Sequence, residues 1–332
     1  MRSVDTLTEQ TTRPRLLHLP MMLPSISALK RRFGRALQLS KRPRLALFEA
    51  HRQIVSPRRR GMLADAAAFF LRQRNGLPFS AAADATIGDA ARRLTAEGLV
   101  HLDPVLTPKQ IADLLAWLAP RHCRNPYEPN GAQFVSTEAP SHVRLGEYPP
   151  EVILQAPYLF RIANDPRFLA IAEKFLGAKP TISNLSLWWS FPTGQAAEEA
   201  QLFHRDVDDL RFCKLFVYLT EVDLDSGPHV FVKGSPQSER CCEIKRYGDD
   251  EVAQAFGLDA VTYLVGDAGS AFIANTLGMH KGLPPIKRTR LLFQVQYSLF
   301  PIMSYEYDPV SNDSLQFAPD AYVNRLYLKS AD

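Results

Sequence analysis

Apolar residues are spaced as on helices in the first part of the chain and as on strands after Pro180. Between Ser25 and about Arg52, apolar positions lie three and four residues apart, which predicts a helix. Residues 61–74 and 85–97 predict two more helices, and Gly98 follows the second as a stop signal.

Two further helices are marked by their first residues. Thr107 can cap a helix that has Pro108 at its first position, and apolar residues follow it at helical spacing. Asp165-Pro166 opens another helix in the same way, and Gly177 ends it. A short apolar run at Leu99–Leu102 predicts the first strand of the main domain.

After Pro180, short runs rich in aromatic and β-branched residues alternate with turn residues. The predicted strands are Thr181–Phe191, Gln201–Val207, Lys214–Val222, His229–Lys233, Val261–Val265, Gly269–Ala274 and Arg290–Phe300. This number of short strands separated by turns indicates a sandwich or jelly roll. The polar stretch Arg121–Glu147 predicts a long loop, and such loops often act as lids.

Composition indicates a globular protein without a membrane span. The chain has 332 residues, of which 46% are apolar and 22% charged, and it has no apolar run near twenty residues. Its 4 cysteines show no CxxC spacing, so neither a disulfide framework nor a zinc ribbon is expected. Reduced thiols and a cytoplasmic location are the expectation.

Positive charge is concentrated at the N-terminus. Residues 1–60 contain 14 Lys and Arg against 3 Asp and Glu, a balance of +11, and the rest of the chain contains 25 against 32, or −7. Such a segment can be a solvated arm, or it can contact an anionic or lipid-linked partner. We expect neither nucleic-acid binding nor a membrane span.

The chemistry begins with His204 and Asp206. On a strand, residues two apart project from the same face, so this pair would place an imidazole beside a carboxylate. By itself the His-x-Asp pair is a weak signal, because it is common in unrelated proteins. Its significance depends on the residues that follow.

A second histidine and an arginine give that context. His280 follows a glycine-bounded apolar strand, and Arg290 opens another apolar strand ten residues later. Two histidines and one carboxylate leave open positions on a metal, as ferrous oxygenases require. An arginine in the same cavity could hold a carboxylate through two hydrogen bonds.

With these residues the chain resembles the phytanoyl-CoA dioxygenase family of iron(II)/2-oxoglutarate oxygenases. The resemblance covers about residues 90–305 and is sharpest at Phe203–Asp206, Asp225–His229, Val232–Ser235 and His280–Arg290. It implies an α+β fold with a double-stranded β-helix (a cupin-like jelly roll), and it implies Fe(2+), 2-oxoglutarate and O2 as the cofactors.

The family's residue roles transfer to this chain by position. The resemblance implies that His204, Asp206 and His280 bind iron and that Arg290 pairs with the distal carboxylate of 2-oxoglutarate. Related enzymes that halogenate usually have a small residue in place of Asp206, so its carboxylate favours hydroxylation or another oxidation, such as desaturation, of an unactivated C–H bond.

The chain departs from related enzymes beside this arginine. Many of them have Ser or Thr two places after the arginine, where this chain has Leu292, so a helping hydroxyl must come from elsewhere. Arg288 also lies near, but we prefer Arg290 because it has the ten-residue spacing and adjoins the apolar strand.

Further site residues are suggested by strand alternation. Asn184 lies on a partly polar strand face and is a candidate 2-oxoglutarate contact. Lys214 and Tyr218 share a face of a strand that lines the cavity in resembling enzymes; a surface role for the lysine is the alternative. For His229 we favour a hydrogen-bonded core histidine.

The implied domain plan has four parts. Residues 1–23 would form a flexible basic tail, 24–89 a helical extension, 90–305 the dioxygenase domain, and 306–332 a C-terminal extension that packs on it.

Two other classes of function stay open. One is a cupin-like metalloenzyme that uses the same ligands without a cosubstrate, and the other is a non-catalytic binding protein with the same fold. A carboxylate-binding arginine would favour the oxygenase. The substrate would be a small molecule or a lipid-linked molecule, and neither its identity nor the oligomeric state follows from the sequence.

Overall fold

The computed structural model describes residues 43–75, 84–128, 130–311 and 317–329. By its contacts the chain divides between Ala46 and Leu47, and the fold described below belongs to residues 47–332. The basic tail expected for residues 1–23 lies outside the described residues, as does the first part of the helix expected from Ser25.

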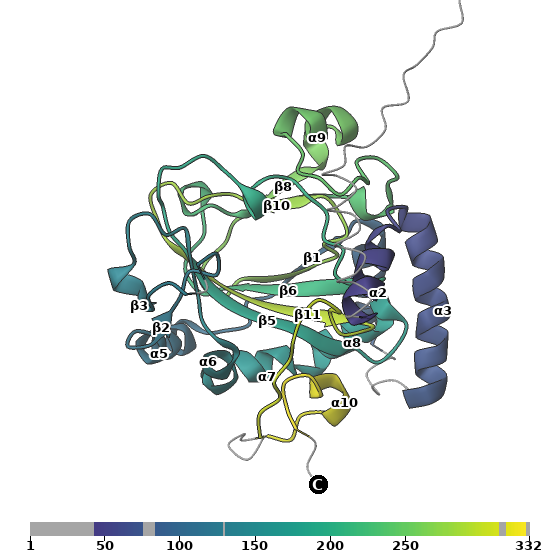
Figure 1. The fold of residues 1–332 in the computed structure, drawn as a ribbon, viewed down its shortest axis with the longest axis horizontal. Helices are drawn as coiled ribbons and strands as arrows, with labels where there is room; N and C mark the ends of the chain where they lie inside the picture. The colour runs from purple at the N-terminus through teal and green to yellow at the C-terminus, as the bar shows by residue number, and fades with distance from the viewer. Residues whose placement is uncertain (1–42, 76–83, 129, 312–316, 330–332) are drawn as a thin grey trace, which may run out of the picture. The chain divides into compact units, whose positions relative to one another are not determined.

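A large antiparallel sheet runs through the centre of the fold (Figure 1). Its strands, in spatial order, are β1 (Leu99–Leu102), β9 (Ala271–Ala274), β6 (Phe212–Tyr218), β11 (Arg290–Ser298), β5 (Thr181–Ser190) and β4 (Leu145–Glu147). The two longest, β5 and β11, are paired from Arg290 opposite Ser190 to Ser298 opposite Thr181.

A smaller sheet faces it, with the order β10 (His280–Gly282), β7 (His229–Val232) and β8 (Val261–Leu264). An antiparallel bridge between His204 and His280 adds one more segment at the free edge of β10. From β5 onward the chain alternates between the sheets: the segment at His204 joins the smaller sheet, β6 the larger, β7 and β8 the smaller, β9 the larger, β10 the smaller and β11 the larger. This is a jelly roll, so the expected α+β double-stranded β-helix is confirmed.

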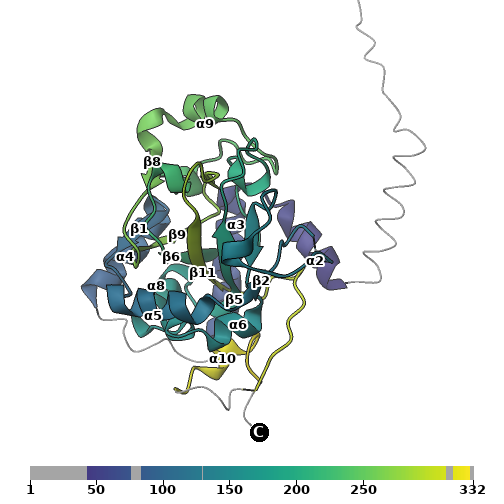
Figure 2. The same ribbon diagram turned by 90° about the vertical axis from the view of Figure 1, so that its left-hand side faces the viewer.

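Helices cover one face of the large sheet. They are α4 (Ala85–Ala96), α5 (Pro108–Leu118), α6 (Pro150–Gln155), α7 (Leu159–Ala163) and α8 (Pro166–Leu176). In Figures 1 and 2, α5, α6 and α8 lie on one side of this sheet and the smaller sheet lies on the other. The main apolar core lies between these helices and the sheet, where Phe168 of α8 shares a cluster with Leu187 of β5 and Phe293 of β11.

Strand alternation explains why polar side chains occupy the other face. Residues two apart leave a strand on the same side, so the odd-numbered residues of β11 from Leu291 to Val295 enter the helix-covered core. Arg290, Leu292 and Gln294 therefore face the smaller sheet. All three are buried, and all three line a cavity between the sheets.

The expected helix ends are confirmed. Thr107 caps α5 and forms a reciprocal capping box with Gln110. Asp165 caps α8, and Gly177 ends it with φ 77°. The helices expected at 61–74 and 85–97 correspond to α3 (Pro57–Asn75) and α4.

Other helices were not expected. They are α6, α7, α9 (Asp249–Phe256) and α10 (Ala321–Asn324), all of eight residues or fewer. Such short segments do not repeat a helical pattern often enough to be detected. α2 (Pro43–Arg52) lies in the range where a helix was expected. No helix among the described residues is long and apolar enough to cross a membrane.

Two strand expectations need correction. Residues 201–207 do not form a continuous strand: they hold the end of a 3-10 helix (Glu199–Gln201) and single bridges at Phe203 and His204. His280, expected where a strand gives way to a loop, instead begins the short strand β10.

Candidate metal centre

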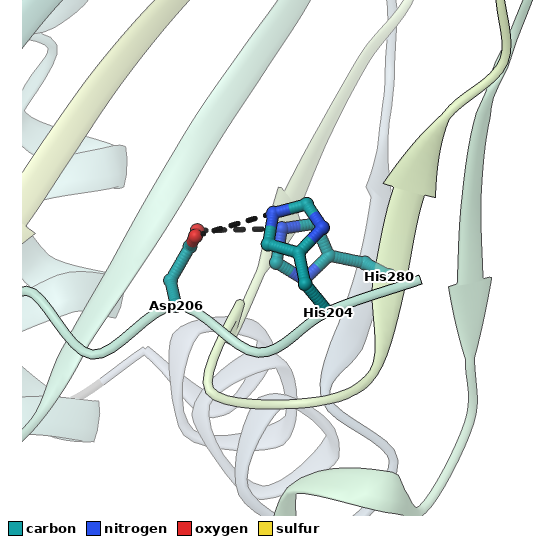
Figure 3. A group of neighbouring side chains, drawn as sticks. All are labelled: His204, Asp206 and His280. Atoms are coloured by element: carbon teal, nitrogen blue, oxygen red, sulfur yellow. Dashed lines mark ion pairs between the residues drawn. The ribbon is translucent and has the colours of Figure 1, made fainter. Parts of the chain in front are cut away.

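Three side chains converge at the centre of the jelly roll (Figure 3). His204, Asp206 and His280 each offer a ligand atom, and these atoms lie within 4.8 Å of one another. His204 Nε2 lies 3.4 Å from Asp206 Oδ1, and His280 Nε2 lies 3.3 Å from Asp206 Oδ2. Two imidazoles and one carboxylate at this spacing suit a divalent transition metal with open coordination positions.

Backbone pairing brings these distant residues together. His204 N donates to His280 O at 2.9 Å, and His280 N donates to His204 O at 3.0 Å. Asp206 N donates to Thr276 O at 2.9 Å. The expectation that His204 and Asp206 share one face of a strand is wrong, because Asp206 lies beyond the bridge in irregular backbone, but the two side chains do converge.

Each imidazole is oriented by its other nitrogen. His204 Nδ1 lies 2.9 Å from Leu202 O, and His280 Nδ1 lies 2.9 Å from Gly278 O. A carbonyl can only accept, so Nδ1 carries the proton in both rings and Nε2 keeps its lone pair for a metal. Burial lowers the pKa of His280, which favours this neutral form.

Lys214 holds the carboxylate of this group in its ionised form. Its Nζ donates to Asp206 Oδ2 at 2.7 Å and lies 3.1 Å from Asp208 Oδ2. Burial alone would raise the pKa of Asp206, but Lys214 and the imidazoles hold it well below its usual range. Lys214 is itself buried, so its alternative as a surface lysine is ruled out, and its ammonium group is paired with these carboxylates.

Arg290 is a buried cation without an acidic partner among the described residues. Only 5% of the residue is exposed, and its one hydrogen bond is from Nη2 to Ser190 Oγ at 3.2 Å. Nε and Nη1 are buried with no partner. Arg288, the alternative, is half exposed and pairs with Asp223 and Glu221, which supports the choice of Arg290.

The metal-ligand group and Arg290 open into one cavity of about 390 Å³, within the usual range for small-molecule sites. The segment expected to be a long loop contributes Tyr127, Arg144 and Glu147 to its wall. Within that segment the structure also has short strands, β2 (His122–Cys123) and β3 (Phe134–Val135), and the 3-10 helix Ser136–Glu138.

The remaining candidates divide between the cavity and the core. Asn184 lines the cavity and donates through Nδ2 to Ser186 Oγ at 3.1 Å. Tyr218 does not line it: its hydroxyl donates to Leu264 O at 2.7 Å and accepts from His229 N at 3.1 Å. The geometry therefore gives no support to a cosubstrate contact at Tyr218.

Sequence reasoning missed one residue of the cavity and assigned another to the core. Ser190 was not singled out, since only the strand pairing places it opposite Arg290. His229 is buried as expected, but it lines the cavity and its Nε2 has no hydrogen-bond partner. All four cysteines lie in the described ranges and are unpaired.

No protein-family model and no curated protein matches the chain. Solved structures do match. One is SnoK, a non-heme alpha-ketoglutarate-dependent carbocyclase from nogalamycin biosynthesis, at 18% identity over 67% of this chain and 87% of that chain, with a TM-score of 0.47. EctD from S. alaskensis, with 2-oxoglutarate and 5-hydroxyectoine, matches at 18% identity over 77% and 88%, with a TM-score of 0.49.

HygX from Streptomyces hygroscopicus, with nickel, 2-oxoglutarate and hygromycin B bound, matches at 16% identity over 71% and 95%, with a TM-score of 0.46. Similarity at this level carries no argument about this chain. The function proposed below therefore rests on the chain's own side chains.

Proposed function

We propose that this protein is a non-haem iron(II)- and 2-oxoglutarate-dependent dioxygenase. The observation that carries the proposal is one cavity that holds both a His-Asp-His group and a buried arginine with two unpaired nitrogen atoms. Leaving buried N–H groups without acceptors costs roughly 1–3 kcal/mol each, so such a site is built for an anion.

The donor set fits iron(II). His204 and His280 would each bind through Nε2, and Asp206 would bind through its carboxylate. Three protein ligands leave room on the metal for a chelating keto acid and for oxygen.

Arg290 separates this proposal from a metalloenzyme without a cosubstrate. A carboxylate can accept two hydrogen bonds from one guanidinium group, and the distal carboxylate of 2-oxoglutarate would satisfy the buried nitrogen atoms of Arg290. An enzyme that binds only a metal ion and a neutral substrate has no use for an unpaired cation in its cavity.

The chain's own residues then define the reaction. When bound, ferrous iron with 2-oxoglutarate and O2 supplies the oxidising power, and the cosubstrate becomes succinate and carbon dioxide. Lys214 keeps Asp206 ionised as a ligand, and the cavity that would hold the reacting atoms lies between the two sheets. Asp206 favours hydroxylation or desaturation of a C–H bond over halogenation, because its carboxylate takes the position that a halide needs.

The finer assignments are also proposals. Membership of the phytanoyl-CoA dioxygenase family is supported by Phe203–Asp206, Asp225–His229 and the spacing from His280 to Arg290. The cavity volume supports a small-molecule substrate. An anionic or lipid-linked substrate is supported only by the basic charge of residues 1–60, and a cytoplasmic location only by the unpaired cysteines.

The proposal is tested by anaerobic titration. Protein mixed with iron(II) and 2-oxoglutarate should develop a weak visible charge-transfer band, and admission of oxygen with a turned-over substrate should release succinate. His204→Ala should abolish the band, since it removes one of the three ligands. The control is His142→Ala, an exposed histidine that does not line the cavity.

Two results would contradict the proposal. One is the absence of any band from the wild-type protein, and the other is full succinate release by His204→Ala. Unchanged turnover in Arg290→Ala would instead favour the metalloenzyme without a cosubstrate.

A further inference from the structure

His229 is a buried histidine whose outer ring nitrogen has no hydrogen-bond partner. It is the first residue of β7 and lies opposite Gly282 of β10. Only 6% of the residue is exposed, and Nε2 is buried without a partner. The ring lines the same cavity as the metal-ligand group.

His229 contacts one of the proposed metal ligands, and its partner in the neighbouring strand lies near Arg290. Its ring is stacked on His280, with centroids 5.4 Å apart and planes 20° apart. Gly282, its register partner, lies near the guanidinium: a Cβ atom added to Gly282 would lie 3.7 Å from Arg290 Nη2. The imidazole therefore lies along the cavity wall that joins the metal ligands to the arginine.

Packing does not explain an imidazole at this position. Its ring neighbours include Phe216, with centroids 4.8 Å apart, and Phe272, with centroids 5.5 Å apart. An apolar side chain would fill such a space without leaving a buried polar atom unsatisfied, which costs roughly 1–3 kcal/mol. The unpaired nitrogen is better explained by a hydrogen bond to a ligand in the cavity.

We propose that His229 Nε2 donates a second hydrogen bond to the distal carboxylate of 2-oxoglutarate, beside the guanidinium of Arg290. A carboxylate has about four acceptor positions, and one guanidinium group fills two of them. Leu292 stands where many related enzymes have Ser or Thr, so this position offers the carboxylate no hydroxyl group in this chain. The inference rests on the proposed function and adds a binding residue to it.

The test compares two keto acids that differ only in the distal carboxylate. Affinities of the wild type and His229→Leu for 2-oxoglutarate and for 2-oxopentanoate are measured with anaerobic iron(II), by titration of the charge-transfer band. Both keto acids chelate the metal, but only 2-oxoglutarate has a carboxylate for Arg290 and His229. His229→Gln keeps an N–H group near the position of Nε2, and His142→Leu is the matched control.

His229→Leu should weaken 2-oxoglutarate binding by about 10-fold or more, as expected for a lost hydrogen bond to a charged group. Its affinity for 2-oxopentanoate should stay within about twofold of the wild type. His229→Gln should recover most of the difference, and His142→Leu should match the wild type. The melting temperature of His229→Leu without ligands should equal or exceed that of the wild type, because the substitution removes the buried, unpaired Nε2.

Other outcomes overturn the inference. Equal 2-oxoglutarate affinity in the wild type and His229→Leu would show that the proposed hydrogen bond does not form. An equal loss of affinity for both keto acids would show that His229 acts on the metal site instead. If His229→Leu does not fold, the same comparison is made with His229→Phe, which also lacks the N–H group, and wild-type affinity for both keto acids in that variant overturns the inference. A wild type that gives no band with either keto acid refutes the proposed function itself, and the inference with it.

Discussion

Arg205 stands in the chain between two of the proposed metal ligands, yet its side chain points away from the metal site. Its guanidinium donates to five backbone carbonyl groups. The acceptors belong to Ser235, Ser238, Arg240, Cys241 and Leu277. One side chain thus connects the segment of His204 and Asp206 to the loop after β7 and to the turn before His280.

Arg205→Lys should therefore be damaging although it conserves charge. A single ammonium group cannot reach five carbonyls in different directions, so we expect a loss of about 2–4 kcal/mol in the free energy of unfolding. Metal affinity should fall about 10-fold, as for other residues that orient metal ligands. Urea unfolding and cobalt(II) titration measure the two effects, with the half-exposed Arg288→Lys as control. Equal stability of the two variants would refute the structural role of Arg205.

Asp209 gives the fold a pH dependence. It is buried, and its carboxylate accepts from Leu210 N at 2.7 Å and from Phe300 N at 2.8 Å. Burial raises its pKa to about 7. Because the folded state holds this proton more tightly than the unfolded state, the stabilisation is complete below about pH 4 and is lost as the pH rises through 7.

The measurement compares the wild type with Asp209→Asn, which cannot ionise. Between pH 5 and pH 8 the wild type should lose about 2–3 kcal/mol relative to the variant in urea unfolding. Asparagine offers one acceptor fewer than aspartate, which can change the stability at every pH. Only the change of the stability difference with pH is therefore informative. If the stability of the wild type relative to the variant stays constant or rises with pH, the raised pKa is contradicted.

At the scale of the elements, the turn before β7 depends on a glycine. Gly227 has φ +72°, and a Cβ atom there would overlap the carbonyl oxygen of Leu283 and lie 2.7 Å from atoms of Pro284 and Pro285. Leu283 lines the cavity. The turn that leads into His229 therefore packs directly on a loop of the cavity wall.

Gly227→Ala and Gly234→Ala separate this contact from backbone strain. Gly234 has nearly the same φ, +74°, but no atom within 4 Å of the added Cβ. Gly234→Ala should cost only the left-handed backbone penalty, about 1–2 kcal/mol, and Gly227→Ala should cost about 1–3 kcal/mol more. Urea unfolding gives both values, and equal losses would show that the loop yields to the methyl group.

Elements with a local signal could be predicted from the sequence. The caps at Thr107 and Asp165 act within one helical turn, and the alternation along β5 and β11 extends over nine or more residues. β10 has three residues and no alternation to detect. The segment around His204 becomes a bridge only because His280 pairs with it, and no local pattern reports that pairing.

At the scale of the whole molecule, the register between distant strands could not be predicted from the sequence. The proposed metal ligands and Arg290 could be chosen from residue type, spacing and the resemblance to a known family. Ser190 and His229 could not be chosen in this way. Their places at the cavity depend on which residue lies opposite in the neighbouring strand: Arg290 opposite Ser190, and Gly282 opposite His229. Those pairings are set by packing across the complete sheets.

The contacts of the chain also predict where it can be shortened. Arg60 of α3 is buried and donates through Nη1 to Asp209 O at 2.6 Å, and His51 Nε2 lies 2.7 Å from Val207 O. Both partners directly follow the segment of the proposed metal ligands. We therefore propose that the region from Leu47 onward, and not the expected domain start at residue 90, is what the folded core requires.

Removal of residues 1–75, which takes away α2 and α3, should cost at least about 3 kcal/mol in the free energy of unfolding or prevent folding, and the protein that lacks only residues 1–42 is the control. Urea unfolding and metal titration of the two truncated proteins measure this. Equal stability of both would show that α3 is dispensable.

The same truncated protein tests the proposed anionic partner. Binding to vesicles of phosphatidylglycerol and phosphatidylcholine is measured in low salt, and a loss of binding on removal of residues 1–42 would support that partner.

The ring protons on Nδ1 of His204 and His280 have a consequence for metal supply. Both rings are already oriented, with no proton on Nε2, so the site can bind any borderline divalent cation. Sites with nitrogen and oxygen donors bind cobalt, nickel and copper more tightly than iron. Selectivity for iron cannot come from such a rigid, generic donor set. If the proposed function holds, the free concentrations of competing ions around the folding chain will therefore decide which ion a cell loads into this site.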